Sequence, residues 1–286
     1  MADALRVMGL CKSYPGFALT EVSFSLPEGY IMGFVGRNGA GKTTTIKCVL
    51  DMLARDGGHI EVLGHDAIDD QVTVKQDLGV VFDQPFYPPE WKVAQVGQAL
   101  RPFYARWDEA LFHRHIDRFG LPAGKRVREL SRGMGMKLML AAALSHHARL
   151  LILDEPTSGL DPVARDDVLD VLADLISGGG VSVLFSTHIT ADLERIADYI
   201  TFIDAGRVVF TGAKDDLADA YRMIHGGPGQ ATDQVRRRAI GLRSTEVGFS
   251  ALVRSADRAG LPPGITDQAP SIDDVLIHIA RQGDAR

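Results

Sequence analysis

The stretch that decides the fold is Gly36-Arg37-Asn38-Gly39-Ala40-Gly41-Lys42-Thr43. It follows an apolar run at 31–35, which predicts a buried strand, and it leads into residues 44–50, which can continue as a helix. The glycine-rich turn therefore sits at the start of a helix, where free backbone N–H groups and the helix dipole favour anions. The stretch predicts a site for the phosphates of a nucleoside triphosphate.

Each residue type in this phosphate loop, residues 36–43, has a predicted task. The glycines lack a Cβ atom, so the backbone can bend round an anion and aim successive N–H groups at it. Lys42 supplies a full positive charge for the β- and γ-phosphates. The hydroxyl of Thr43 is placed to bind the Mg²⁺ that accompanies them.

The composition is that of an ordinary globular protein. Its 286 residues are 45% hydrophobic and 24% charged, and the formal net charge is −6. An acidic chain does not attract nucleic acid non-specifically, and we expect the only basic triplet, Arg236-Arg237-Arg238, to be a solvated helix face. The sequence therefore predicts no nucleic-acid partner.

Cysteines and apolar runs bear on the cellular compartment. Cys11 and Cys48 form neither a disulfide framework nor a metal-ligand spacing, which predicts a reducing compartment. The N-terminus lacks the apolar stretch of a signal peptide. No window approaches the roughly 18 consecutive apolar residues of a membrane helix. We expect a cytoplasmic protein whose membrane tasks, if any, need a partner.

Alternating and fully apolar segments predict one α/β domain over residues 1–214. Its expected strands lie at 5–10, 19–26, 31–35, 57–64, 78–82, 150–153 and 181–185, followed by a hairpin at 199–203 and 208–210. Eight aromatic residues occur between 84 and 120 among helical patterns. We interpret 84–146 as a helical insertion whose aromatic residues form its core and part of an exposed docking surface.

The pattern weakens beyond residue 214. Residues 247–258 predict a strand that passes into a helix, and Ser271 begins an N-capped amphipathic helix. We interpret 215–286 as a small α+β extension. Its predicted role is either to regulate the protein or to stabilise a dimer.

Two carboxylates follow the most apolar strand. A buried parallel strand is predicted by the fully apolar run Leu150-Leu151-Ile152-Leu153, and Asp154 and Glu155 lie at its carboxyl end. Together with the phosphate loop, Asp154 fits a Mg²⁺ ligand, and Glu155 fits the general base that orients and deprotonates the attacking water.

From about residue 5 to 214, these motifs resemble the nucleotide-binding subunit of ATP-binding-cassette (ABC) transporters. Leu130-Ser131-Arg132-Gly133-Met134 resembles the signature loop of that family, and Ser158-Gly159-Leu160-Asp161 resembles the loop that communicates across its dimer. His188 resembles the switch histidine, Gln84 the glutamine that senses the γ-phosphate, and Tyr14 the aromatic residue that stacks on adenine. Each of these three is a weak signal alone, but their order along the chain is specific.

The resemblance implies a P-loop NTPase fold with an antiparallel β subdomain, and a full set of site residues. The expected catalytic residues are Glu155, His188 and Gln84, and the expected Mg²⁺ ligands are Thr43, Gln84 and Asp154. The expected ATP contacts are Tyr14, Gly36, Arg37, Asn38, Gly39, Ala40, Gly41, Lys42, Thr43, Thr44, Ser131 and Gly133.

The signature loop departs from the family pattern at two positions. Arg132 replaces the usual second glycine, and Met134 replaces the usual final glutamine. Ser131 and Gly133 are intact, so we expect their hydroxyl and backbone N–H to face the γ-phosphate of the opposite subunit. A basic residue followed by Gly-Met resembles the separate-chain ATPases of exporters of drugs, antibiotic peptides or lipids.

The resemblance implies a MgATP-driven dimer, formed with a second ABC ATPase chain, on the cytoplasmic face of the cell membrane. Hydrolysis would release the dimer, and its motion would pass to a separate membrane permease through the region after Gln84. Two alternatives remain open from the sequence. One is a non-transport ABC ATPase that acts on DNA or ribosomes, and the other is a regulatory module that binds ATP without hydrolysing it.

Overall fold

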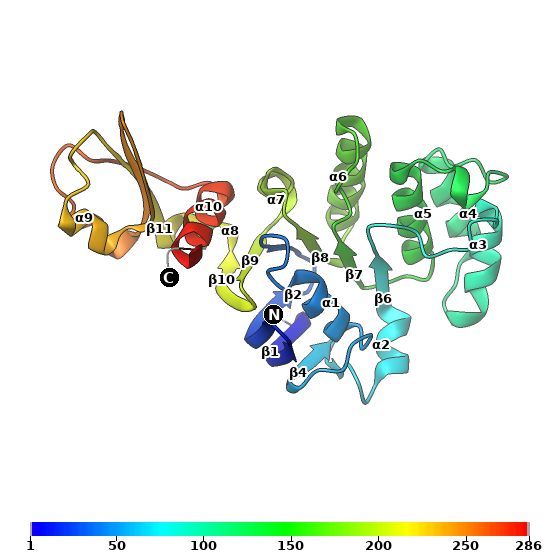
Figure 1. Ribbon diagram of the computed structural model, residues 1–286. Helices are drawn as coiled ribbons and strands as arrows, with labels where there is room; N and C mark the ends of the chain where they lie inside the picture. The colour runs from blue at the N-terminus through cyan, green and yellow to red at the C-terminus, as the bar shows by residue number, and fades with distance from the viewer. Residues whose placement is uncertain (1, 285–286) are drawn as a thin grey trace.

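The structure is a computed structural model that describes residues 2–284. Three sheets and their covering helices follow one another across the molecule (Figure 1). The strands are β1 (Asp3–Tyr14), β2 (Phe17–Pro27), β3 (Ile31–Val35), β4 (Gly57–Val62), β5 (His65–Asp66), β6 (Leu78–Val81), β7 (Leu150–Asp154), β8 (Ser182–Thr187), β9 (Tyr199–Asp204), β10 (Arg207–Ala213), β11 (Tyr221–Gly226), β12 (Ile240–Thr245), β13 (Gly248–Arg254) and β14 (Thr266–Gln268).

Ten α-helices and three short 3₁₀ helices lie in the same range. They are α1 (Lys42–Val49), α2 (Gln71–Asp77), α3 (Val93–Leu100), η1 (Arg101–Phe103), α4 (Glu109–Arg118), η2 (Val127–Glu129), α5 (Arg132–Ser145), α6 (Pro162–Ser177), α7 (Thr190–Ile196), α8 (Lys214–Ala220), α9 (Asp233–Arg238), η3 (Ser255–Gly260) and α10 (Ile272–Asp284).

The central sheet has six strands in the order β10-β9-β3-β8-β7-β6. β3 pairs in parallel with β8 and β9, and β7 pairs in parallel with β6 and β8. All residues of β3, β7 and β8 are buried, which is typical of parallel strands covered on both faces. Because these three neighbours are parallel, their carboxyl ends meet at one edge of the sheet, and the predicted phosphate loop and carboxylates follow there.

The second sheet is antiparallel, with the order β2-β1-β4-β5. Tyr14 and Phe17 pair across the tight turn that joins β1 to β2. The apolar faces of β1, β2 and β4 share one core with α1 and with β3 and β7 of the central sheet. The α/β core with an antiparallel subdomain is thereby confirmed.

The helical insertion lies on the β6 side of the central sheet (Figure 1). α5 packs mainly against β6 and α4. The aromatic residues of the insertion are of two kinds: Phe112 is fully buried, whereas Phe86 is 75% exposed and Phe103 is 72% exposed. The insertion therefore shares one core with the central sheet, where the sequence predicted a core of its own, and it carries an exposed aromatic surface.

The C-terminal extension contains the third sheet, in the order β12-β13-β11-β14, with α9 and α10. The predicted strand near 247 and the predicted helix from 271 are confirmed as β13 and α10. The Ser271 hydroxyl accepts a hydrogen bond from the Asp274 N–H at 3.0 Å and caps α10. The other three strands were not predicted. The boundary at residue 214 coincides with the start of α8 and stays a prediction.

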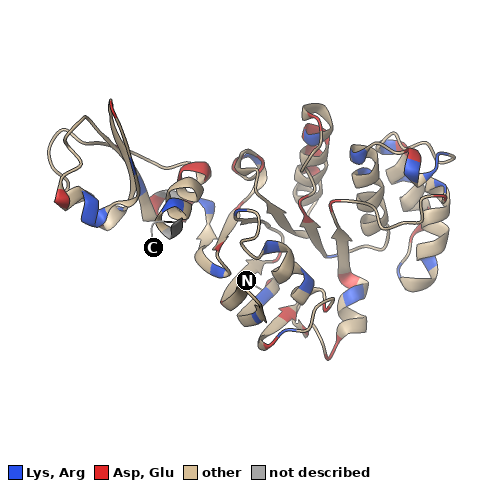
Figure 2. Ribbon diagram, viewed as in Figure 1, with Lys and Arg blue, Asp and Glu red and all other residues tan. Residues whose placement is uncertain are grey.

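Charged side chains of both signs are interspersed along the visible elements (Figure 2). The basic triplet lies on α9, where Arg236 and Arg237 are exposed, so it is the solvated helix face that the sequence predicted. None of the helices between residues 2 and 284 combines the length and the apolar character needed to cross a membrane.

The β9–β10 turn at the edge of the central sheet is hydrogen-bonded to the phosphate loop and to β2. Gly206 donates its N–H to the backbone oxygen of Ala40 at 2.9 Å and accepts a hydrogen bond from the Thr20 N–H at 2.9 Å. Its φ is +74°, and a Cβ atom there would lie 1.8 Å from the backbone oxygen of Ala18. The turn therefore requires glycine both for its backbone conformation and for space.

We expect Gly206→Ala to lower the free energy of unfolding by about 2–4 kcal/mol, because it combines left-handed strain with a steric clash. Gly16→Ala is the matched control, since Gly16 has a φ of +84° but no atom within 4 Å of its Cβ position. That variant should lose only the strain contribution, about 1 kcal/mol. Urea unfolding measures both, and equal losses would show that the clash at Gly206 is relieved at no cost.

Candidate nucleotide-binding and hydrolysis site

The phosphate loop connects β3 to α1 and is packed against neighbouring strands. A Cβ atom on Gly36 would lie 2.3 Å from the backbone oxygen of Ile203. Gly41 is the N-cap of α1 with a φ of +116°, and a Cβ atom there would lie 2.6 Å from the Leu19 side chain. Glycine at both positions lets the loop lie close to β2 and β9 while its N–H groups gather at the start of the helix.

Lys42 is almost completely enclosed, with 5% of the residue exposed. Its ammonium group donates hydrogen bonds to the backbone oxygens of Gly36 at 2.7 Å and Arg37 at 3.4 Å. It also lies 3.2 Å from Glu155 Oε1. A buried ammonium has lost its hydration, and these three contacts replace the hydrogen bonds that water would make. They also hold the side chain against the loop.

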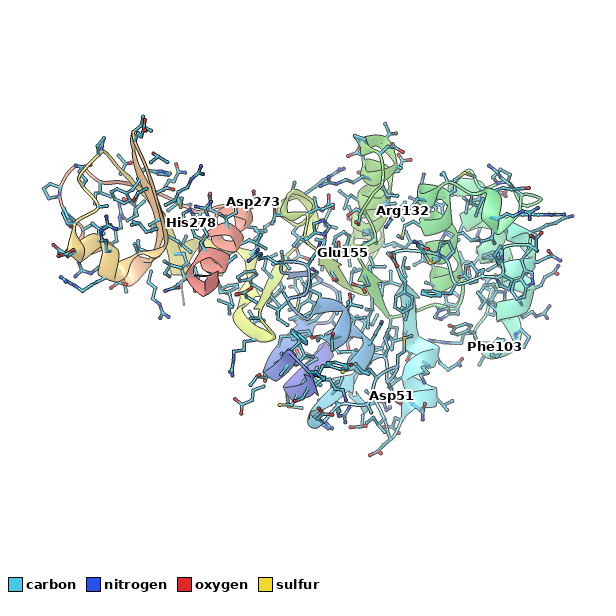
Figure 3. All side chains as sticks on the ribbon, in the orientation of Figure 1. Asp51, Phe103, Arg132, Glu155, Asp273 and His278 are labelled. Atoms are coloured by element: carbon cyan, nitrogen blue, oxygen red, sulfur yellow. The ribbon has the colours of Figure 1, made fainter. Side chains whose placement is uncertain are left out.

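Glu155 and His188 follow the neighbouring strands β7 and β8. His188 Nδ1 lies 2.8 Å from Glu155 Oε2, so one carboxylate contacts both the lysine and the histidine. Glu155 has a φ of +53°, a conformation that non-glycine residues adopt at a cost and that is often found at active sites. The structure thus brings Lys42, Glu155 and His188 together at one edge of the sheet, where Figure 3 shows Glu155.

Asp154, the last residue of β7, is 7% exposed. Its Oδ1 has no hydrogen-bond partner among residues 2–284. Burial raises the pKa of this carboxyl, and the hydroxyl groups of Thr43 and Ser186 oppose that shift. A buried carboxylate oxygen without a partner costs free energy unless another group, such as a cation, contacts it.

The residues present fit Mg²⁺. This ion prefers oxygen ligands and commonly binds through one or two protein groups together with substrate phosphates. Thr43 and Asp154 offer a hydroxyl and a carboxylate on the side of the phosphate loop. Among residues 2–284 there is no cluster of three His, Cys, Asp or Glu side chains that would hold a metal ion without a nucleotide.

Ser131 is the N-cap of α5, in the helical insertion. Its hydroxyl accepts a hydrogen bond from the Met134 N–H at 3.3 Å, which leaves the hydroxyl proton available for another acceptor. Gly133 is buried, and a Cβ atom there would lie 3.0 Å from the Ala164 side chain. The guanidinium of Arg132 lies against Gly159, with Nη1 2.7 Å from the position that a Cβ atom on Gly159 would take.

Most of the remaining predicted residues are exposed. Gln84 is exposed three residues beyond the end of β6, and Tyr14 is exposed at the tip of the β1–β2 hairpin with the Lys12 ammonium 5.7 Å from its ring centre. The other predicted contacts belong to the phosphate loop and first turn of α1: Arg37, Asn38, Gly39 and Thr43 are exposed, Thr44 is half-buried and Ala40 is buried.

Sequence reasoning missed three polar residues in or beside the turn between β7 and α6, residues 155–161, which we call the catalytic turn because it begins with Glu155. Asp192 on α7 contacts Thr157 and Arg165 through its carboxylate. The available signal was an acidic residue on the inward face of a short helix directly after His188. It is too weak to detect without knowing which helices pack together.

Comparisons with known proteins decide the family. The family model described as ABC transporter matches residues 19–158. The chain is 32% identical over 313 residues to the daunorubicin resistance ATP-binding protein DrrA3 of Streptomyces coeruleorubidus, a match that covers 100% of this chain and 98% of that protein. The chain belongs to the family of ABC transporter ATP-binding proteins. This confirms the resemblance that the motifs indicated.

Other members of the ABC family are similar over comparable lengths. The Nod factor export ATP-binding protein I of Rhizobium leguminosarum bv. viciae is 29% identical, with 96% of this chain and 94% of that protein covered. A solved structure of the ATP-binding subunit of an ABC transporter has a TM-score of 0.67 and 28% identity, and the match covers 75% of this chain and 91% of that one. The ABC ATPase fold is therefore shown, and ATP is the nucleotide of this family.

Replacing Lys42 with alanine should abolish measurable MgATP binding, because it removes the buried ammonium that would pair with the phosphates. Lys47→Ala is the matched control, since Lys47 is exposed on the last turn of the same helix. Titration calorimetry should give an unchanged affinity for the control. Near-normal ATP affinity in Lys42→Ala would show that the triphosphate binds elsewhere.

Proposed function

We propose that this chain is the ATP-hydrolysing subunit of an ABC exporter, and that it works as a dimer on a separate membrane permease. The observation that carries the proposal is the convergence of Lys42, Asp154, Glu155 and His188 at one sheet edge. Phosphoryl transfer to water requires a cation for the phosphate charge, a metal ligand, a base that accepts a proton and a group that orients this base. In the proposal, Lys42, Asp154, Glu155 and His188 fill these roles in that order.

The chain's own residues divide the chemistry among them. Loop N–H groups and Lys42 bind and orient the triphosphate. When bound through Thr43 and Asp154, Mg²⁺ would neutralise charge on the phosphate oxygens. Glu155 accepts a proton from the attacking water at a carboxylate oxygen, and His188 holds that carboxylate in position.

A second ABC chain completes the site in this proposal. The tip of the phosphate loop, Arg37 to Gly39, is exposed, so the triphosphate is covered on one side only. Ser131 is exposed at the start of α5 and keeps its hydroxyl proton available, which suits it to cover the nucleotide of another chain. Closure of two chains excludes water from both sites and is reversed by hydrolysis.

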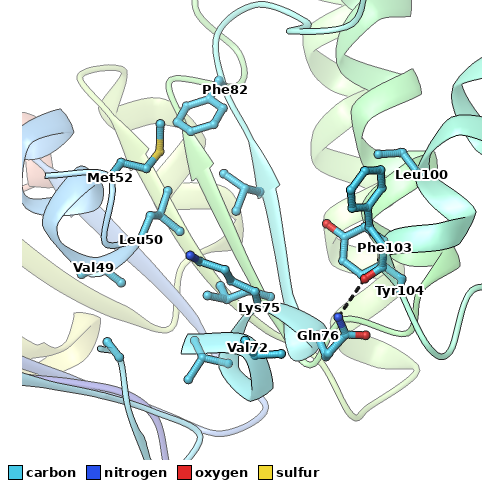
Figure 4. Close-up of a pocket in the computed structure, with 14 residues that line it drawn as sticks. Val49, Leu50, Met52, Val72, Lys75, Gln76, Phe82, Leu100, Phe103 and Tyr104 are labelled. Atoms are coloured by element: carbon cyan, nitrogen blue, oxygen red, sulfur yellow. Dashed lines mark hydrogen bonds between the residues drawn. The ribbon is translucent and has the colours of Figure 1, made fainter. Parts of the chain in front are cut away.

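The exposed aromatic surface of the insertion suits a permease. A cavity of about 480 Å³ lies between the end of α1 and the insertion, and its lining includes Met52, Val72, Phe82 and Phe103 (Figure 4). Exposed Phe86, two residues after Gln84, packs edge-to-face against Phe82 of this lining, with ring centres 5.1 Å apart. We propose that an apolar helix from a cytoplasmic loop of the permease occupies this cavity, because exposed aromatic side chains beside a hollow are typical of protein interfaces.

A neighbouring hollow extends the same surface toward α5. His146 lines it, stacks on Tyr104 with ring centres 3.9 Å apart, and has no hydrogen-bond partner for Nδ1 among the described residues. Burial lowers the pKa of His146 to about 4, so its ring is neutral near pH 7 and adds no charge to this largely apolar hollow. Failure of the chain to co-purify with a permease from detergent-solubilised membranes would contradict this docking.

Similarity to export and resistance proteins supports the exporter assignment. The matches to the daunorubicin resistance and Nod factor export proteins extend over nearly the whole chain, including the extension. The Arg132-Gly133-Met134 sequence resembles the same branch of the family. ATP-dependent accumulation of the cargo in inside-out membrane vesicles tests the direction, and ATP-dependent loss from such vesicles would contradict it.

Glu155→Gln should lower ATP hydrolysis by a factor on the order of 10²–10⁴, because the amide keeps the shape of the carboxylate but cannot accept a proton. Nucleotide contacts remain, so the variant should also shift from monomer to dimer when ATP is added. Phosphate release and light scattering measure the two effects. Glu246→Gln, at an exposed turn of the extension, is the control and should behave as the unchanged chain.

Normal hydrolysis in Glu155→Gln would show that another group is the base. Absence of hydrolysis in the unchanged chain would favour a module that binds ATP without turnover. A mass independent of ATP in Glu155→Gln would contradict a homodimer and point to a different partner chain.

A further inference from the structure

A buried carboxylate that has no role in the proposed mechanism lies against the catalytic turn. Asp192, on α7, is 1% exposed. It accepts hydrogen bonds from the Thr157 hydroxyl at 2.6 Å and from Arg165 Nε at 2.5 Å. A buried carboxylate is tolerated because it is paired and hydrogen-bonded in this way, and loss of either partner would be costly.

These contacts join the segments that carry Glu155 and His188. Thr157 is two residues beyond Glu155 and is itself buried. The helix of Asp192, α7, begins two residues beyond His188. Arg165 belongs to α6, which follows directly after the turn. One carboxylate therefore fixes the distance between the turn after β7 and the helix after β8.

The Glu155–His188 contact depends on that distance. The two side chains meet at 2.8 Å although they come from different strands. Glu155 also holds a positive φ, a backbone conformation that persists only where the surroundings constrain it. Thr157 lies within this turn, and its hydrogen bond to a rigid buried group supplies such a constraint.

We propose that Asp192 is a positioning residue for ATP hydrolysis. Through Thr157 and Arg165 it holds α7, and with it His188, in the orientation that directs Glu155 at the attacking water. The inference rests on the proposed hydrolytic function and adds a residue that does not touch ATP. It predicts an effect on the chemical step and not on nucleotide binding.

Asp192→Asn tests the charge while keeping the size of the side chain. The matched control is Asp170→Asn, because Asp170 pairs with Arg195 and so joins the same two helices, α6 and α7, but at the surface. Both variants remove one ion pair between the same helices. Only Asp192 also contacts the catalytic turn.

Steady-state phosphate release should show kcat reduced by about tenfold or more in Asp192→Asn, with KM for ATP within about threefold of the unchanged chain. The control should change neither value by more than about twofold. Amide hydrogen exchange without nucleotide should be faster over 188–196 in Asp192→Asn than in Asp170→Asn. Equilibrium ATP affinity, measured in EDTA, should be unchanged in both.

A second pair of variants protects the test if Asp192→Asn does not fold. Thr157→Val removes the hydroxyl but keeps the shape, and it should lower kcat in the same way. Thr157→Ser keeps the hydroxyl and should recover most of the lost rate. An active unchanged chain with normal kcat in Asp192→Asn and in Thr157→Val would overturn the inference, and so would equal losses in Thr157→Val and Thr157→Ser. Inactivity of the unchanged chain would refute the hydrolytic function instead.

Discussion

The contact between the Lys42 ammonium and the Glu155 carboxylate is the interaction on which the rest of the site depends. Both groups are largely removed from water, and their charges are 3.2 Å apart. A triphosphate that enters the phosphate loop needs the same ammonium and repels the same carboxylate. In the proposed function, Lys42 therefore exchanges Glu155 for phosphate oxygens when ATP binds. After this exchange, Glu155 would keep its contact with His188, and its Oε1 would be free to receive a proton.

Much of this site could be predicted from local sequence. The phosphate loop and the Asp154-Glu155 strand end are short continuous patterns, and the parallel sheet brings them together without further information. The Asp192 contacts with Thr157 and Arg165 could not be predicted, because they depend on how α6 and α7 pack after the chain has folded. The same limit applies to Arg132, whose contact with Gly159 joins residues that are far apart in sequence.

The extension shows the same contrast. α10 was predictable from its cap and its apolar spacing, whereas β11, β12 and β14 are short strands with mixed polarity. β11 and β12 pair with β13, and β14 pairs with β11, so their pairing depends on contacts that form only in the folded sheet. The structure places the start of α10 against α7, where the Thr190 hydroxyl donates to Asp273 at 2.9 Å and the Ile272 N–H donates to Glu194 at 2.7 Å. Figure 3 shows Asp273 at this junction. The helix that follows His188 is thus held by the catalytic turn and by the extension.

The exchange of Lys42 between Glu155 and phosphate can be measured as an affinity. ATP binding would be compared between the chain with Glu155 unchanged and the Glu155→Gln variant, in EDTA, which blocks hydrolysis. Both proteins would also carry Ser131→Arg, so that closure of a dimer does not contribute to the measured affinity. Because an amide neither competes for the ammonium nor repels the phosphates, the account predicts that Glu155→Gln binds ATP about fivefold more tightly, or about 1 kcal/mol. Equal or weaker binding in Glu155→Gln would contradict it.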